Sequence, residues 1–328
     1  MDQKVNHGIF TISLDFELHW GVSDHRTVKS YKENLDNTPQ VVDKLLKVFL
    51  ERKIHVTWAT VGMLFCDNKE SLTNNFPNNL PSYTNPRLSN YDIVDDIGHN
   101  IDDDPYHYAL PLISKIRATP HQEIGTHTFS HYYTLEAGQT LDQFREDMNA
   151  AFTIAQREDI NMKSIVFPRN QYADEHIEVI EELGTTAYRG NESHWIYLPR
   201  SRAHETWTRK LFRLIDAYIK ISGDNTYNID FKEKCINIRS SRFLRPYSPT
   251  FRLLDPLRLY RIKKEMTYAA QNNRLFHLWW HPHNFGAYTT KNLDFLNRIL
   301  DHYDRLNSTY GFQSLNMQEV SKLKKDGL

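Results

Sequence analysis

The sequence predicts an α/β protein built as a distorted barrel of parallel strands with helices on the outside. Strand-like apolar segments alternate with helix-like segments, an order typical of parallel strands joined by crossover helices. Several of the predicted strands end in polar or charged residues, and in barrel enzymes the active site forms at these strand ends. The 328 residues suffice for one domain of barrel size. We therefore expect a single domain over residues 1–328.

The N-terminal part follows this pattern most clearly. Residues 8–15 are rich in β-branched and apolar side chains and indicate a buried strand. Thr38 and Pro39 are typical of a helix start, and apolar residues at helical spacing continue to Arg52. Residues 54–60 form the next predicted strand. The order strand, helix, strand indicates parallel pairing.

Two segments interrupt the alternation, and we interpret both as insertions into the barrel. Residues 67–110 are rich in Asn, Pro, Asp and Tyr, and we expect an irregular excursion with one short helix there. Within it, Asp102, Asp103, Asp104, His99 and His107 indicate a solvated loop. Residues 190–250 interrupt the pattern again, apart from an amphipathic piece at 207–219.

The remaining elements follow in order from local signals. A capping-box pattern at Thr140 and Gln143 opens a helix, and Gly184 ends another. The sequence predicts strands at 123–126, 164–167, 186–189 and 274–280, helices at 140–158, 173–183, 256–272 and 291–306, and finally a short strand and a closing helix.

Composition excludes several classes of protein. Lys and Arg number 40 against 41 Asp and Glu, so no net charge recruits nucleic acid. No apolar run approaches the length of a transmembrane segment, and residues 1–7 lack the layout of a secretory signal. Cys66 and Cys235 stand in no paired motif, which suits a reducing compartment. These features predict a cytoplasmic protein and leave its oligomeric state open.

The most specific chemical signal is a histidine pair, His127 and His131, which follows the predicted strand that ends near Gly125. Imidazoles four residues apart share one face where a loop enters a turn of helix. With 16 histidines in the chain, such pairs also arise by chance. The position directly after a strand favours metal binding over chance.

An acidic pair, Asp15 and Glu17, lies at the end of the first predicted strand. Residues two apart in a strand point the same way, so both carboxylates can enter one site. In isolation they would be two solvated carboxylates in a loop. One carboxylate and two imidazoles, however, are a standard set of ligands for an open divalent-metal site. The second carboxylate is then free to act as a base on water, which predicts a metal-dependent hydrolase.

Two further strand ends carry candidate residues. Arg169 is either surface charge or, if it points inward, a partner that keeps Asp15 ionised and oriented. The last predicted strand ends in His281-Pro-His283, where a histidine can donate a proton to a leaving nitrogen. The preceding Trp279-Trp280 pair offers aromatic faces for a sugar ring, although alternation along a strand puts at least one of the two in the core.

Taken together, these segments resemble the polysaccharide deacetylase family, also called the NodB-homology or carbohydrate esterase family 4 fold. The resemblance extends over roughly residues 8–290 but is carried by short motifs. They are Ser13-Leu-Asp15-Phe-Glu17, His127-Thr-Phe-Ser-His131, Phe167-Pro-Arg169 with Tyr172, and Leu278-Trp-Trp-His281-Pro.

The sequence departs from the commonest form of that family in three places. The acidic pair is spaced by one residue instead of being adjacent, and its presumed metal ligand is Glu. In the third motif Pro168 precedes Arg169. No residue marks the acid that orients the proton-donating histidine, and Asp216, Asp224 and Asp230 are all open.

The resemblance implies a seven-stranded (β/α) barrel and a sugar N-deacetylase. It implies one divalent cation on Glu17, His127 and His131, with Zn as the first choice and Co, Ni or Fe as alternatives. Asp15 would be the base and His281 the acid, with His283 as the alternative donor. The substrate would be an N-acetylated sugar in a surface glycan or glycan precursor. Under the same resemblance, the catalytic set also includes Arg169, and the candidate substrate-binding residues are Tyr172, Trp280 and His283.

Other interpretations stay open. A glycan-binding protein of the same fold without turnover would account for the departures. A barrel glycosidase would use Asp15 and Glu17 directly, but acids two apart on one strand are poorly placed to flank a glycosidic bond. Residues 239–264 are rich in Arg and either dock an anionic lipid head or pyrophosphate at a membrane or form an ordinary surface compensated by Asp255 and Glu265, which we favour.

Overall fold

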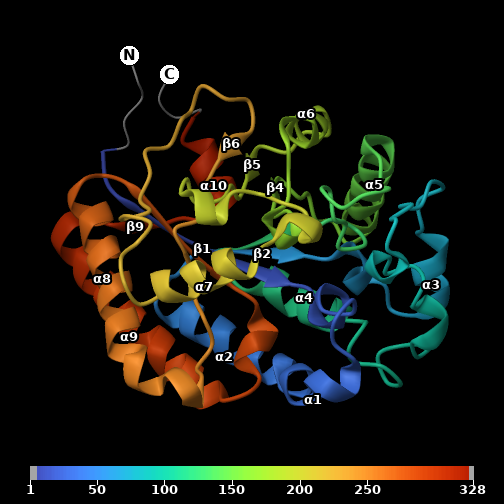
Figure 1. Ribbon diagram of the computed structural model, residues 1–328, viewed down its shortest axis with the longest axis horizontal. Coiled ribbons are helices and arrows are strands. Elements are labelled where there is room, and N and C mark those ends of the chain that lie inside the picture. Colours follow the sequence, from blue (N-terminus) through green and yellow to red (C-terminus); the bar gives the residue numbers. More distant parts are fainter. Residues whose placement is uncertain (1–5, 325–328) are drawn as a thin grey trace.

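The computed structural model describes residues 6–324 and places a parallel sheet at the centre of the molecule, with helices around it (Figure 1). Residues 1–5 lie outside this range; they belong to the segment 1–7 in which we predict no secretory signal. The strands are β1 (Ile9–Phe16), β2 (Val56–Thr60), β3 (Gln122–Thr126), β4 (Ser164–Ile165), β5 (Ala187–Tyr188), β6 (Ile236–Asn237), β7 (Arg242–Phe243), β8 (Leu275–Trp280) and β9 (Gln313–Ser314).

The helices match the predicted order, with two additions that we did not predict, α1 and α4. The helix α1 begins with a capping box of Thr27 and Ser30, a signal that the sequence does carry. The helices are α1 (Val28–Asp36), α2 (Thr38–Glu51), α3 (Lys69–Asn74), α4 (Leu110–Ala118), α5 (Leu141–Arg157), α6 (Asp174–Glu182), α7 (Trp207–Asp216), α8 (Asp255–Gln271), α9 (Thr289–Tyr310) and α10 (Met317–Lys322).

The sheet has the order β6-β5-β4-β3-β2-β1-β8-β7, with β9 beside β1, and every named strand pairs in parallel. The central strand β1 is buried along its whole length, as expected for a parallel sheet covered on both faces. Asp15 pairs in register with Ala59 of β2. The carboxyl ends of β1, β2 and β3 therefore lie side by side, which brings their following residues to one edge of the sheet.

One segment, residues 236–244, joins the two edges of the sheet. In its first half, the amides of Ile236 and Ile238 donate hydrogen bonds to carbonyls at β5. In its second half, the amides of Ser241 and Leu244 donate to carbonyls of β8. The strands β6 and β7 thus fill one position between β5 and β8, and the predicted distorted barrel is confirmed. The segment predicted as an insertion at 190–250 therefore contains the part of the chain that joins the barrel edges.

The helices bury their apolar faces against this barrel. In α2, Pro39 stands in the first turn, where its missing N–H costs nothing, and Val41, Val42, Leu45 and Phe49 face the core. The helix α5 opens with the predicted capping box of Thr140 and Gln143. None of the helices within residues 6–324 combines the length and the apolar character needed to cross a bilayer, and the cytoplasmic location stays a prediction.

The segment 67–110 is irregular, as predicted, but part of it is not a solvated loop. Asp104 and His107 are buried, and Nδ1 of His107 lies 2.7 Å from a carboxylate oxygen of Asp104. The other nitrogen of His107 is 2.8 Å from Nδ1 of His19, and the indole of Trp20 donates to the His107 carbonyl. These contacts fix the segment onto the 3-10 helix η1 (Leu18–Gly21), which directly follows Glu17.

Candidate metal centre

Three buried side chains meet at the carboxyl ends of β1 and β3. One carboxylate oxygen of Glu17 lies 3.2 Å from Nε2 of His127 and 3.1 Å from Nε2 of His131. The potential ligand atoms all lie within 4.8 Å of one another, and the described residues contain no other such group of three. Ligand atoms at about 2.0–2.1 Å from a tetrahedral Zn²⁺ are roughly 3.4 Å apart. Both the chemistry and the spacing of the three groups fit a divalent cation.

Each imidazole presents Nε2 to Glu17 because its other nitrogen has a partner. Nδ1 of His127 donates to the carbonyl of Val166 at 2.7 Å, which fixes the tautomer and leaves Nε2 with a free lone pair. Nδ1 of His131 lies 3.1 Å from the hydroxyl of Tyr133. This arrangement, with an outer hydrogen bond that orients a ligating histidine, is the usual one at protein metal sites.

The loop that carries both histidines is strained and not helical, so the predicted turn of helix is wrong. Thr128 and His131 both have left-handed backbones, with φ of 64° and 60°, and such a backbone is unfavourable for a β-branched residue. The buried carboxylate of Asp147 in α5 accepts hydrogen bonds from the amides of Phe129 and Ser130, at 2.7 and 3.2 Å. Asp147 therefore holds the loop that brings the two imidazoles together.

Glycine is required at position 21 by the close approach of Glu17. A Cβ atom at Gly21 would lie 2.0 Å from Cδ of the Glu17 side chain. The backbone of η1 thus folds directly over the carboxylate and limits where it can move. Burial alone would raise the pKa of Glu17, but His281, His131 and His127 outweigh it and hold this pKa well below its usual value.

Asp15 is held by Arg189, a residue that sequence analysis did not select. The two guanidinium nitrogens of Arg189 donate to the two oxygens of Asp15 at 2.6 and 2.9 Å. Arg189 also donates to the hydroxyl of Ser13 and to the side-chain oxygen of Asn170. Burial would raise the pKa of Asp15, but the charge of Arg189, followed by that of His281, outweighs it and lowers the pKa.

The prediction that Arg169 pairs with Asp15 is therefore wrong. Arg169 has a left-handed backbone with φ of 54°, and its guanidinium bonds Asp24 at 2.5 Å. It lies 4.1 Å from the ring centre of Tyr133, whose hydroxyl contacts His131. Arg189 occupies the position beside Asp15 because it directly follows β5, which ends at the same end of the barrel as β1.

His281 and His283 lie on the other side of the acidic pair. Nε2 of His281 is 3.6 Å from both Asp15 and Glu17, and this side chain is 22% exposed. Nε2 of His283 is 3.8 Å from Glu17, and its side chain is 3% exposed. Burial lowers the pKa of His283 to about 3, which favours its neutral form near pH 7. Of the two, His281 is the more exposed and the one that lies 3.6 Å from both carboxylates.

None of the three aspartates considered as a partner for the proton donor contacts His281. Asp216 is buried between Arg242 and Arg261, which attach α7 to the barrel. Asp224 pairs with Lys220, and Asp230 accepts from the amide of Lys232. Within residues 6–324, the hydrogen-bond partner of His281 Nδ1 is the side chain of Asn284.

The aromatic candidates divide as strand alternation requires. Trp280 is 0% exposed and packs against Phe49 and Phe285 in the core, so the prediction that it binds substrate is corrected. Trp279 points the other way, beneath the guanidinium of Arg189 at 4.1 Å. Tyr172 packs against Phe167 and its hydroxyl accepts from the amide of Asn191. The roles of Tyr172 and His283 toward substrate stay predictions.

A series of hydrogen bonds between polar side chains lies behind Arg189, and we did not predict it from the sequence. Nδ1 of His277 donates to the carbonyl of Ile238, so its Nε2 accepts from Ser13, 2.8 Å away. Ser13 in turn accepts from Arg189. The signal for Arg189 was its place at the end of a predicted strand, 186–189. The signal for His277 was a polar residue inside an otherwise apolar strand.

The comparisons with known proteins identify the fold. No family model matches the chain, and no curated protein matches it in sequence. A protein from Mycobacterium smegmatis assigned as a polysaccharide deacetylase matches with a TM-score of 0.61 at 10% identity, over 99% of this chain and 93% of its own. A protein from Pseudomonas aeruginosa PAO1 with the same assignment matches with a TM-score of 0.54 at 10% identity, over 97% and 89%.

Puue allantoinase matches as well, with a TM-score of 0.53 at 10% identity, over 97% of this chain and 88% of its own. At such identity the likeness concerns the fold, and one fold can carry several activities. The motifs that suggested the resemblance lie where the barrel brings its strand ends together. The chain has the fold of the polysaccharide deacetylases.

Proposed function

We propose that this protein is a metal-dependent hydrolase that removes an N-acetyl group from an amino sugar in a glycan or glycan precursor. The observation that supports this proposal most is that two groups of side chains lie together at one end of the barrel. The first is the Glu17–His127–His131 group, which fits a divalent cation. The second is Asp15, held by Arg189 and 3.6 Å from His281.

The three ligand residues set the requirements for the cation. Zn²⁺ suits one carboxylate and two imidazoles best, and Co, Ni or Fe would fit the same atoms. A divalent cation held there would lower the pKa of a water molecule and polarise the amide carbonyl. Glu17, His127 and His131 are all buried, which strengthens electrostatic interactions with the substrate.

The remaining residues would handle the protons. Asp15 would accept the proton of the attacking water, whose oxygen forms a bond with the carbonyl carbon. Arg189 would keep Asp15 ionised and fix its orientation. His281 would donate a proton to the nitrogen as the C–N bond breaks, which yields acetate and a free amine. Trp279 lies on the side of β8 that faces Arg189, and it would pack against the sugar ring.

Acetate release from N-acetylated sugars tests the proposal, with Asp15→Asn as the main variant. We expect a rate lower by roughly 10²–10⁴-fold, the usual contribution of a positioned base. Asp36→Asn is the matched control, because Asp36 lies on the surface and pairs with Lys32. Release of reducing ends instead of acetate would indicate a glycosidase. Metal binding without any acetate release would indicate a glycan-binding protein.

A further inference from the structure

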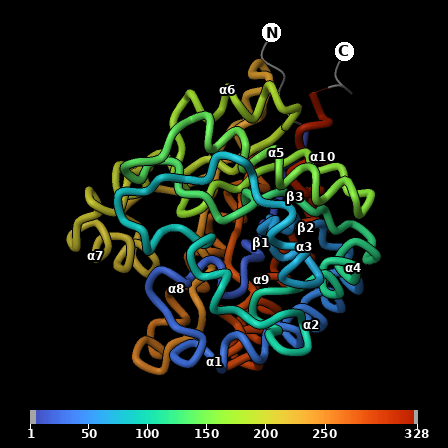
Figure 2. Tube along the Cα trace, turned by 90° about the vertical axis from the view of Figure 1, so that its right-hand side faces the viewer, coloured from blue at the N-terminus to red at the C-terminus, as the bar shows by residue number. Residues whose placement is uncertain are grey.

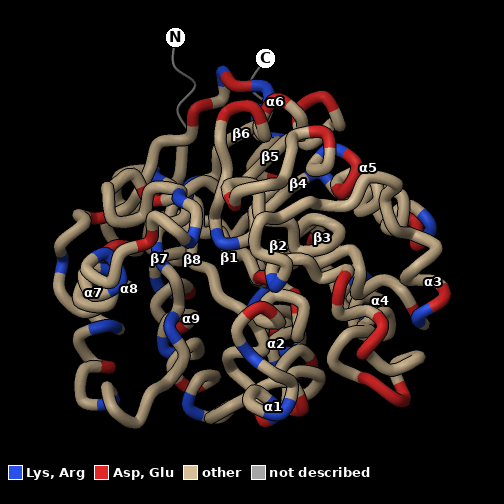
Figure 3. The backbone as a smooth tube through the Cα atoms, turned by 45° about the vertical axis from the view of Figure 1, so that its right-hand side comes forward, with Lys and Arg blue, Asp and Glu red and all other residues tan. Residues whose placement is uncertain are grey.

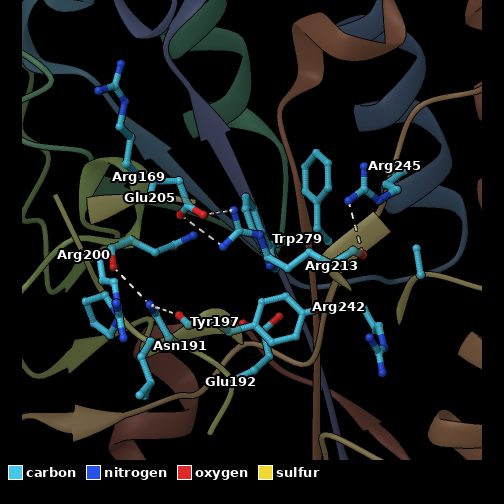
Figure 4. A pocket seen from close by; sticks show the side chains of 15 residues that line it. Arg169, Asn191, Glu192, Tyr197, Arg200, Glu205, Arg213, Arg242, Arg245 and Trp279 are labelled. Atoms are coloured by element: carbon cyan, nitrogen blue, oxygen red, sulfur yellow. Dashed lines mark hydrogen bonds and ion pairs between the residues drawn. The ribbon is translucent and has the colours of Figure 1, made fainter. Parts of the chain in front are cut away.

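A cavity of about 320 Å³ adjoins the candidate metal centre. Its wall includes Trp279, which lies beneath Arg189, and Phe243, whose ring centre is 5.8 Å from that of His281. The size falls within the range of small-molecule sites, which begins at about 300 Å³. The rest of the wall comes from the segments after β4 and β5, from α7, and from β7 with the segment after it (Figure 4).

The wall of the cavity is rich in arginine. Three of the five arginines are compensated by carboxylates: Arg169 by Asp24, Arg213 by Glu205, and Arg242 by Asp216 and Glu265. In Figure 4 the Arg169 side chain extends away from the other labelled groups, whereas Arg213 and Glu205 face each other. The other two, Arg200 and Arg245, form no ion pair with any carboxylate in residues 6–324.

Arg245 stands out because it is half-buried and cationic without a counter-charge. One of its nitrogens donates to the carbonyl of Arg213 at 3.4 Å. Burial lowers the pKa of Arg245, and the like charge of Arg213 adds to this effect. A buried cation in such surroundings is costly unless an anion accompanies it. Of the remaining Arg-rich stretch, Asp255 and Glu265 compensate Arg258 and Arg261.

The same wall holds a buried hydrogen-bond donor without a partner among the described residues, Nε1 of Trp279. Glu192 also lines the cavity, where it accepts a hydrogen bond from Ser240, and burial raises its pKa. The uncompensated guanidinium of Arg245, the exposed Arg200 and the free donor of Trp279 together suit an oxyanion.

We propose that this cavity binds the phosphate or pyrophosphate group on which the amino sugar is carried. An oxyanion there would supply the counter-charge that the half-buried Arg245 lacks, and the exposed Arg200 lines the same cavity. A planar guanidinium can also donate two parallel hydrogen bonds to two oxygens of one phosphate. The sugar would then extend past Trp279 toward Asp15 and His281. The assignment to a substrate rests on the proposed function, but anion binding itself does not.

Titration of the metal-free protein with inorganic pyrophosphate at low salt tests this site by calorimetry. We expect one binding site per chain and at least a tenfold weaker affinity in the Arg200→Gln/Arg245→Gln double variant. Arg245→Lys should lose part of the affinity, because it keeps the charge but not the paired donors. Arg87→Gln, an exposed arginine on the 3-10 helix at 86–88, is the control and should bind as the parent does.

Acetate release then identifies the carrier of the phosphate. The substrates are free N-acetylglucosamine, its uridine diphosphate derivative and its polyprenyl pyrophosphate derivative in vesicles. A higher kcat/KM for either phosphorylated form, lost in the double variant, supports the site and names a nucleotide or a lipid as the carrier. Pyrophosphate binding that is absent, or that is equal in the parent and the double variant, would overturn the site. A failure of all acetate release would contradict the proposed function alone.

A second surface next to the cavity has an inverted arrangement of side chains. In α7 the two buried residues are charged, Arg209 and Asp216. Its exposed residues include the apolar Trp207, Leu211 and Phe212, and Trp207 is 73% exposed. Figure 2 shows α7 projecting from the molecule at the left, on the side where the chain leads into α8. There Leu253 is 84% and Tyr260 65% exposed.

This outward face is both apolar and basic. We define the α7 face as the exposed apolar residues of α7 and of the elements that follow it: Trp207, Leu211 and Phe212 of α7, Ile219 just after it, Leu253 of the 3-10 helix at 249–254, and Leu257 and Tyr260 of α8. Lys210, Arg252 and Lys264 are exposed in the same elements, whereas the charge of Lys220 is compensated by Asp224. Figure 3 shows the basic positions of α7 and α8 gathered at one side of the molecule. Exposed apolar groups on this scale mark a binding surface more often than chance scatter.

We infer that the α7 face lies on an anionic membrane surface. Aromatic and leucine side chains flanked by lysine and arginine are the composition of interfacial helices, and the positive charge complements anionic headgroups. Because Arg213 of α7 and Ala217 just after it line the cavity, a membrane there would adjoin the proposed phosphate site. Docking of a second copy is less suited, because two such basic faces would repel each other.

Co-sedimentation with vesicles tests the α7 face. Vesicles of phosphatidylglycerol and phosphatidylcholine should bind the protein, vesicles of phosphatidylcholine alone much less, and high salt should weaken binding. Trp207→Ser/Phe212→Ser should reduce binding at least tenfold, whereas Tyr310→Ser on α9 should not. Equal binding by the double variant would overturn the inference. So would a dimer in light scattering that the double variant abolishes without any binding to vesicles.

Discussion

Both oxygens of Asp15 accept hydrogen bonds from Arg189, at 2.6 and 2.9 Å. The guanidinium lies between this carboxylate and the indole of Trp279. A paired contact of this kind fixes a carboxylate in orientation as well as in charge. Arg189 is therefore the residue that prepares Asp15 for proton transfer in the proposed reaction.

Arg189→Gln should lower kcat by roughly 10²-fold or more, because a displaced base loses most of the rate that positioned proton transfer contributes. KM and metal content should change little, since Arg189 does not contact Glu17, His127 or His131. Steady-state kinetics and metal analysis check this expectation. Arg169→Gln serves as the comparison and should have the smaller effect on kcat. A larger loss in Arg169→Gln would contradict the assignment.

Gly21→Ala should weaken metal binding, because its Cβ would occupy the space of the Glu17 carboxylate. A shift of one ligand typically costs on the order of 10–100-fold in metal affinity. Competition with a chelator measures the change. Gly8→Ala is the control, because a Cβ there meets the backbone of Ala269 at 2.7 Å. It should lower stability and leave metal affinity unaltered, and equal metal loss in both would contradict the account.

Asp147→Ala should destabilise the fold by about 2–4 kcal/mol, because the amides of Phe129 and Ser130 would lose their buried acceptor. The histidine loop would then relax from its left-handed backbone at Thr128 and His131. Urea denaturation gives the stability, and chelator competition should show weaker metal binding as well. Unchanged metal affinity in a destabilised variant would mean that the loop holds its shape without Asp147.

The carboxyl group of Asp24 should make the free energy of unfolding depend on pH. Burial would raise its pKa, but hydrogen bonds from His25 and the charge of Arg169 outweigh burial and lower the pKa to about 2. Its contribution is fully present above the unfolded pKa of 3.8 and is lost as the pH falls through about 2. Asp24→Asn should therefore cost about 2 kcal/mol at pH 7, and the difference should shrink as the pH falls below 3.8 and vanish below about pH 2. A difference that stays constant from pH 7 to pH 2 would contradict this explanation.

The two tryptophans of β8 should behave differently. Trp280→Ala removes a fully buried ring and should cost about 3–5 kcal/mol in unfolding free energy. Trp279→Ala should affect stability less and raise KM for the sugar, since this side chain lines the cavity beside Arg189. Denaturation and kinetics on both variants check the division. The same KM in Trp279→Ala and the parent would remove Trp279 from the proposed sugar site.

Local sequence signals were sufficient for most of the fold. The capping box at Thr140 and Gln143 and the proline at position 39 mark helix starts that depend only on neighbouring residues. The two halves of the metal group were also predictable, since Glu17 and the histidine pair each follow a strand. Their convergence follows from the parallel pairing of β1, β2 and β3.

What the sequence could not settle depends on contacts between distant segments. Arg169 and Arg189 both follow short strands, and only the path of the chain decides which one reaches Asp15. The Asp and His residues at 99–107 are typical of a solvated loop in the sequence, whereas in the structure His107 is bonded to His19. The segment 236–244 lacks any periodic pattern, because its two halves pair with different strands.

Anomalous diffraction from crystals soaked with Zn²⁺ would locate a cation at Glu17, His127 and His131. We expect one strong peak within about 2.0–2.2 Å of Glu17 Oε2 and of Nε2 in both His127 and His131, and its loss in Glu17→Gln. A missing peak, or a peak only at His19 and His107, would contradict the proposed metal centre.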